Sequence, residues 1–89
     1  MKYNEDHYLA EIEEYIRSTY ESHYASTHDS FQSIDSIMAT GNGQGFCLGN
    51  IMKYSQRYGQ KGDLTEQRKD LMKVIHYAIL MLHVHDTDK

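Results

Sequence analysis

The chain has 89 residues, 39% of them hydrophobic, with no Trp, no Pro and a formal net charge of −4. This length suits one small domain, and such a short chain would bury more surface by self-association. The single Cys, Cys47, excludes an intrachain disulfide and a four-Cys zinc site, and it fits a reducing cytosol. No apolar run approaches the roughly 20 residues that span a bilayer, and the acidic N-terminus does not resemble a signal peptide. We therefore expect one cytoplasmic domain, residues 1–89, without a membrane segment.

An acidic N-terminal helix is predicted over residues 4–22. Its apolar residues recur at steps of three and four: Tyr8, Leu9, Ile12, Tyr15, Ile16 and Thr19. Residues 1–35 carry Lys2 and Arg17 against eight acidic residues, a net −6. Residues 22–30 are rich in Ser, Thr and His, which predicts a connection. A second helix is expected from Asp29 or Ser30 to Ala39.

A glycine-rich break follows at residues 40–45, with three glycines in five residues. Glycine adopts positive φ freely, so the pattern predicts a loop, with the third helix starting near Phe46. Backbone N–H groups at a helix start can cradle a phosphate, although this loop lacks the Gly-Lys-Ser/Thr of the Walker A motif. A flexible connector is the alternative. Gly59 and Gly62 are expected to end the third helix. Its inward positions are predicted to be Cys47, Leu48, Ile51, Tyr54 and Tyr58.

The fourth helix is predicted from a capping box at Asp63 and Glu66 to about His83. Its apolar face is unusually wide: Leu71, Val74, Ile75, Ala78, Ile79 and Leu82. So much apolar circumference favours a central or interface helix. The fold expected is all-α, a small bundle of about four helices that forms a homo-oligomer through the C-terminal helix.

The cations are gathered in one part of this acidic chain. Residues 53–73 hold six Lys and Arg residues against three acidic residues, a net +3. Such clustering indicates an anion site, and phosphate is the commonest candidate. Asn50, Lys53 and Arg57 are spaced i, i+3 and i+7, so they share one helical face, and Lys61 follows. A solvated face with intrahelical ion pairs is the alternative interpretation.

A second polar row, Asp70, Lys73 and Tyr77, has the same spacing on the fourth helix, opposite its apolar face. Asp70 could carry a magnesium ion or accept a proton. Lys73 could bind phosphate, and Tyr77 could stack on a ligand or donate its hydroxyl. The six histidines have no spacing that supports a stable zinc site.

Two acidic residues, Glu11 and Glu14, lie one helical turn apart. This spacing is similar to that of the magnesium-binding helices of the all-α nucleotide pyrophosphohydrolases, the MazG-like group. That group pairs them with a later Glu-x-x-Asp, whereas this chain has Gln67 before Asp70. Half of the metal site is therefore missing, and a solvated acidic face is the better interpretation.

The central stretch resembles a small phage-encoded family, a domain of unknown function usually described as nucleotide kinase-like. The resemblance covers about residues 22–82, and it departs from the family pattern in having Lys69 before Asp70, where Glu is usual. It implies a helical phage protein that phosphorylates nucleoside monophosphates without a P-loop. The residues that carry the resemblance are Gly49-Asn50, Lys53-Tyr54, Arg57, Gly59, Lys61-Gly62, Asp70-Leu71, Lys73 and Tyr77, with His23-Tyr24 and Ile34-Asp35 upstream.

The leading hypothesis is a nucleotide-binding protein, and a nucleotide kinase if it turns its ligand over. Asp70 and Arg57 would be catalytic, and Asp70 would hold Mg²⁺. The nucleotide and phosphate ligands would be Asn50, Lys53, Arg57, Lys61, Lys73 and Tyr77, with His23 and Tyr24 bordering the pocket. The alternatives are a non-enzymatic phage protein that binds a host protein through its acidic first helix, a protein that sequesters a nucleotide, and a MazG-like pyrophosphohydrolase.

Overall fold

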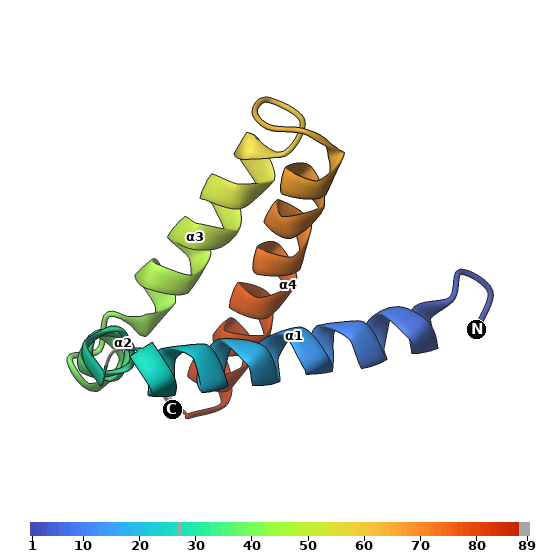
Figure 1. The fold of residues 1–89 in the computed structure, drawn as a ribbon. Helices are drawn as coiled ribbons and strands as arrows, with labels where there is room; N and C mark the ends of the chain where they lie inside the picture. Colours follow the sequence, from blue (N-terminus) through green and yellow to red (C-terminus); the bar gives the residue numbers. More distant parts are fainter. Residues whose placement is uncertain (27, 88–89) are drawn as a thin grey trace.

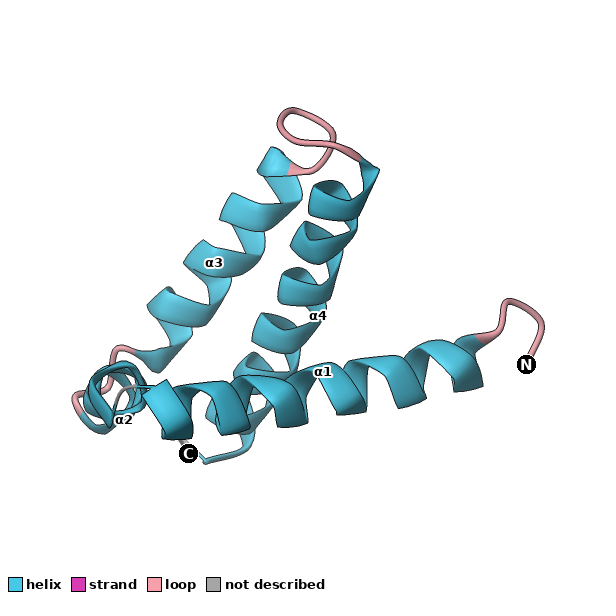
Figure 2. Ribbon diagram, viewed as in Figure 1, coloured by secondary structure: helices cyan, strands magenta, loops and turns pink. Residues whose placement is uncertain are grey.

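The computed structural model describes the backbone of residues 1–26 and 28–87, and the side chains of residues 1–21 and 33–87. This part of the chain forms four helices: α1 (Glu5–Ser26), α2 (His28–Ala39), α3 (Gly43–Arg57) and α4 (Leu64–Thr87). Figure 2 shows helices and loops, with no strand in the described residues, so the all-α prediction is confirmed. None of these helices combines the length and the apolar character needed to cross a membrane.

The hairpin of α3 and α4 is the main packing unit (Figure 1), and a tight turn joins the two helices. Its interior holds Cys47, which has no exposed surface, and Tyr54, Asp70 and Val84, which are exposed by 9% or less. Helix α1 lies across the hairpin rather than along it, and its first six residues, like the turn before them, are exposed. The buried Ile12 lies in the next turn of α1. The site therefore has to be sought where the hairpin meets the crossing helices.

The helix boundaries differ from the sequence prediction on both sides of residue 27. The predicted connection at residues 22–30 is helical up to Ser26 and again from His28. Ser and Thr favour breaks only when their hydroxyls compete with the helical hydrogen bonds. Earlier in α1, the hydroxyls of Ser18 and Thr19 instead donate to Tyr15 and Ile16 carbonyls of the same helix. A polar composition was therefore a poor indicator of a loop here.

The glycine-rich break is also shorter than predicted. Only Gly41 adopts a left-handed conformation, with φ of 80°. Its N–H donates to the Met38 carbonyl, and the Asn42 N–H donates to the Ile37 carbonyl, both at 3.1 Å. These two bonds form a Schellman motif that ends α2.

Helix α3 then starts at Gly43, three residues before the predicted Phe46. A Cβ atom at Gly43 would lie 2.7 Å from the Met38 sulfur and 3.0 Å from a Val84 methyl. This glycine therefore allows α3 to approach α2 and α4 closely. The structure gives it a packing role, rather than the loop role that the sequence indicated.

The turn between α3 and α4 agrees with the prediction. Gly59 and Gly62 have φ of 80° and 85° beyond the end of α3. The Asp63 carboxylate accepts a hydrogen bond of 2.9 Å from the Glu66 N–H, which is the N-cap half of the predicted capping box. The helix continues past His83 to Thr87.

Helix α4 packs against α3 through its polar row, and its apolar face points largely to solvent. The row of Asp70, Lys73 and Tyr77 contacts residues of α3. Much of the apolar face is instead exposed, by 41–64%, at Leu71, Ile75, Ile79 and Leu82. Leu48 and Tyr58, predicted to point inward from α3, are exposed by 42% and 46%. The apolar face of α4 is therefore largely uncovered within one chain, and its use as an interface stays a prediction.

Candidate functional site

Tyr54 of α3 is the point where two predicted phosphate ligands meet. The ring of Tyr77, from α4, stacks on it with 6.0 Å between centroids and 8° between planes. The Lys53 and Lys73 ammonium groups lie 5.2 and 4.9 Å from the centre of the same Tyr54 ring. An aromatic face attracts cations through its quadrupole, so the ring holds both ammonium groups nearby. Residues far apart in sequence thus form one cationic cluster.

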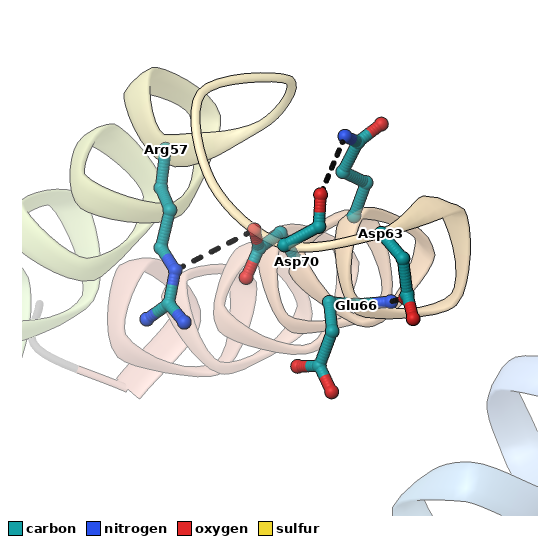
Figure 3. Close-up of polar contacts among 6 residues, drawn as sticks. Arg57, Asp63, Glu66 and Asp70 are labelled. Carbon is teal, nitrogen blue, oxygen red and sulfur yellow. Dashed lines mark hydrogen bonds and ion pairs between the residues drawn. The ribbon is translucent and has the colours of Figure 1, made fainter.

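The predicted catalytic pair, Arg57 and Asp70, faces across the hairpin (Figure 3). The Arg57 Nε lies 3.7 Å from the Asp70 Oδ2, too far for a hydrogen bond but close enough for an ion pair. The Asp70 side chain is 5% exposed, whereas the Arg57 side chain is 42% exposed. The buried Oδ2 has no hydrogen-bond partner in the described structure. Buried polar atoms are normally satisfied, so this carboxylate oxygen makes Asp70 a candidate functional residue.

Asp70 is the residue at this site that could hold a magnesium ion. Magnesium prefers oxygen ligands, and nucleotide enzymes commonly bind it through one or two carboxylates together with substrate phosphates and water. Among the described residues, no three His, Cys, Asp or Glu side chains form a group that could hold a metal. A nucleotide phosphate would therefore have to supply part of the coordination.

A cavity of about 350 Å³ adjoins this cluster, with walls from all four helices. Tyr15 of α1 and His76 of α4 meet edge to face in its wall, with centroids 5.9 Å apart. Burial raises the pKa of the Tyr15 and Tyr77 hydroxyls and lowers the pKa of His76. All three rings are therefore neutral near pH 7, and Lys73 supplies a positive charge at the lining.

Two other predicted ligands, Asn50 and Lys61, are not brought into this cluster. The Asn50 side chain turns back and donates to the Phe46 carbonyl of its own helix at 2.9 Å. Lys61 is exposed in the α3–α4 turn and makes no contact with the cluster among the described residues. His23 and Tyr24 lie in the segment whose side chains the structure does not describe.

The sequence reasoning missed three cavity residues: Tyr15, His76 and Asp35. Tyr15 was assigned only to an apolar stripe, and His76 to a scattered set of histidines. Asp35 carried a usable signal, since it belongs to the Ile-Asp pair of the family resemblance. Nothing in local spacing shows that three different helices would place these residues around one cavity.

Glu11, one of the two acidic residues considered for a pyrophosphohydrolase, is paired with a residue of α4. Both carboxylate oxygens of Glu11 accept hydrogen bonds from the Arg68 guanidinium, one of them at 2.6 Å. This bond with Arg68 lowers the pKa of Glu11. Glu11 therefore fastens α1 to α4, and the neighbouring Gln67 donates to the Gly62 carbonyl. Glu11 and Gln67 therefore both stabilise the fold through hydrogen bonds.

Comparison with known proteins gives the chain a family. The model of a protein family of unknown function, DUF3310, matches residues 17–79. The gene 1.7 protein of Enterobacteria phage T3 is 39% identical over 65 residues, which cover 70% of this chain and 39% of that protein. The nucleotide kinase gp1.7 of Escherichia phage T7 is 39% identical over 62 residues, covering 66% of this chain and 31% of that protein.

The chain thus spans between about a third and two-fifths of the length of these two relatives. No solved structure matches it. The family model covers well over half of the chain, including all of α2 and α3 and most of α4. The resemblance seen in the sequence is therefore confirmed, and this protein belongs to the DUF3310 family.

Proposed function

We propose that the protein binds nucleotides and acts as a P-loop-less nucleoside monophosphate kinase. The observation that carries this proposal is the convergence of Lys53 and Lys73 on one ring beside the Arg57–Asp70 pair. Three cations gathered around one buried carboxylate are groups that phosphoryl transfer requires. The name of the T7 relative, a nucleotide kinase, supports the same reaction.

In this reaction a phosphate oxygen of the monophosphate attacks the terminal phosphorus of a nucleoside triphosphate. The new P–O bond forms as the bond to the bridging oxygen breaks, and the departing diphosphate takes the electron pair. Lys53, Lys73 and Arg57 orient the two anions and stabilise charge on the transferred group. Asp70 holds Mg²⁺, which neutralises phosphate charge when bound. Catalysis of this kind depends on positioning and electrostatics, so it needs no nucleophilic side chain.

A thermal-shift screen against deoxynucleoside monophosphates and triphosphates, with and without Mg²⁺, tests binding. A ligand that binds only the folded chain raises the melting temperature, and above its Kd the rise grows with the logarithm of the ligand concentration. A phosphoryl-transfer assay on the pair that shifts then distinguishes a kinase from a protein that only sequesters nucleotide. A flat response across the panel would contradict nucleotide binding and favour docking of the acidic helix onto a host protein.

We also propose that the exposed face of α4 is covered by a second copy of this chain. The accessible surface is 6775 Å², whereas a compact monomer of this mass exposes about 5,400 Å². The radius of gyration is 14.1 Å, against about 12 Å for a compact domain. The excess surface exceeds the roughly 800 Å² that each partner buries in a standard interface.

The outer stripe of α4 has the form of a self-pairing seam. Leu71, Ile75, Ala78 and Leu82 are spaced four, three and four residues apart, as in a coiled coil. Lys73 is the only charged residue between positions 71 and 82, and it faces Tyr54 instead. Two copies of this stripe can therefore meet without opposing like charges.

Ile75→Glu is expected to reduce the assembly to single chains, because it places a charge in the middle of the seam. Light scattering after size-exclusion chromatography measures the mass. Leu9→Glu is the matched control, since Leu9 is 60% exposed on α1 and lies outside the seam. A wild-type chain that is monomeric at micromolar concentration would contradict the proposal.

A further inference from the structure

We propose that the cavity between the four helices binds the nucleobase of the nucleotide. This inference rests on the proposed function, because it assigns the base end of the ligand whose phosphates the cationic cluster holds. The cavity and the cationic cluster share one residue, Lys73. Lys73 lines the cavity and also directs its ammonium group to the Tyr54 ring beside Lys53.

The size and the walls of the cavity suit a base. Its volume of about 350 Å³ lies at the lower end of the roughly 300–1,000 Å³ of small-molecule sites. Its lining includes the rings of Tyr15, Tyr54, Tyr77 and His76. A nucleobase has two flat apolar faces, and base stacking on aromatic side chains is a general mode of nucleotide recognition. The aromatic rings of the lining can therefore stack on the flat faces of a base.

The lining also offers groups that can bind the edge of a base. His76 is half-buried with a lowered pKa, so it is a neutral imidazole with one donor and one acceptor. Asp35 of α2 provides a carboxylate that accepts from ring or amino N–H groups, and the Thr19 hydroxyl oxygen can also accept, since its own proton is donated to the Ile16 carbonyl. All bases carry such N–H donors, so these groups orient a base without selecting one.

The arrangement fixes which way the ligand lies. The base occupies the aromatic part of the cavity, against the wall that Tyr15 and His76 form. The sugar passes Lys73, and the phosphates reach the side where Lys53, Arg57 and Asp70 lie. Helix α1 supplies Tyr15 and Thr19, so the base site needs the crossing helix in place. The ion pair between Glu11 and Arg68 holds α1 there.

Calorimetric titration of the full chain with three probes tests the inference. The probes are the four deoxynucleosides, their 5′-monophosphates and inorganic tripolyphosphate, which has phosphates but no base. We expect at least one nucleoside to bind, and its monophosphate to bind more tightly. In Tyr15→Leu, affinity for both should fall by about 5- to 100-fold, the range for loss of one stacked ring. Tripolyphosphate affinity should not change.

Tyr8→Leu is the matched control, because Tyr8 lies seven residues earlier on α1, 50% exposed and outside the cavity. It should leave all three affinities unchanged. If Tyr15→Leu does not fold, the wild-type chain still decides: ring-proton NMR signals of Tyr15 and His76 should move with nucleoside and not with tripolyphosphate.

Failure of this inference can be told apart from failure of the proposed function. Nucleosides that do not bind, together with a monophosphate affinity that is unchanged in Tyr15→Leu, would overturn the base site alone. Nucleosides that bind at Tyr15 while no phosphate compound binds or turns over would overturn the kinase proposal and support the cavity. No binding of any probe would overturn both.

Discussion

Asp70→Asn is expected to lower phosphoryl transfer by about 100- to 1,000-fold while leaving the melting temperature unchanged or higher. Loss of one preorganised charged group at a transition state commonly has an effect of this size on the rate. The fold should tolerate the change because the carboxylate is buried, its Oδ2 has no hydrogen-bond partner, and its cation lies 3.7 Å away. A buried charge in such a poor pair contributes little to stability, and a neutral amide has the same shape.

This expectation is checked by measuring kcat/KM and the melting temperature of Asp70→Asn and of the wild-type chain on the same preparations. Asp86→Asn is the matched control, because Asp86 is exposed near the end of the same helix. It should change neither quantity. A large fall in the melting temperature of Asp70→Asn, with activity reduced only in proportion to unfolding, would show that Asp70 is a structural residue instead.

Arg57→Ala is expected to lower kcat/KM by a similar factor, about 2.7–4 kcal/mol at the transition state. Its effect on stability should have the opposite direction to that of Asp70→Asn. Removing the cation leaves the buried Asp70 carboxylate without a counter-charge, which destabilises the fold. The loss should stay modest, because the guanidinium is 42% exposed and solvent screens the pair.

Two further variants separate the roles of Arg57. Arg57→Lys keeps the charge but loses the planar fork that binds phosphate through two bonds, so activity should be intermediate. The double variant Arg57→Ala with Asp70→Asn should regain the lost stability without regaining activity. Arg17→Ala is the control, since Arg17 is exposed and forms its ion pair with Glu13 one turn away. Unchanged nucleotide affinity and turnover in Arg57→Ala would refute the phosphate site.

Much of the fold could be predicted because helical periodicity and capping are local. The four helices, the turn at Gly59 and Gly62, and the Asp63 cap all follow from neighbouring residues. The orientation of α4 could not be predicted the same way. Periodicity shows that Leu71 and Ile75 share a face, but which face meets α3 depends on the partner helix, where Tyr54 attracts the polar stripe.

The candidate site could also be predicted only where it depends on residues of one helix. Lys53 and Arg57 could be placed together on one helix from their spacing, and so could Asp70 and Lys73 on another. Their convergence, and the cavity beside them, depend on how α1 crosses the hairpin. Spacing alone did not predict the role of Asn50. Its amide donates a hydrogen bond to a carbonyl of its own helix and does not join the cluster.

The reactivity of the single, fully buried cysteine can be used to measure how often the α3–α4 hairpin opens. Cys47 has no accessible surface in the interior of the α3–α4 hairpin, and burial raises the pKa of its thiol. A thiol-modifying reagent can reach it only when the two helices separate. The labelling rate therefore measures the free energy of that separation in the unmodified sequence. A ligand that bridges Lys53 and Lys73 across the hairpin should slow the labelling.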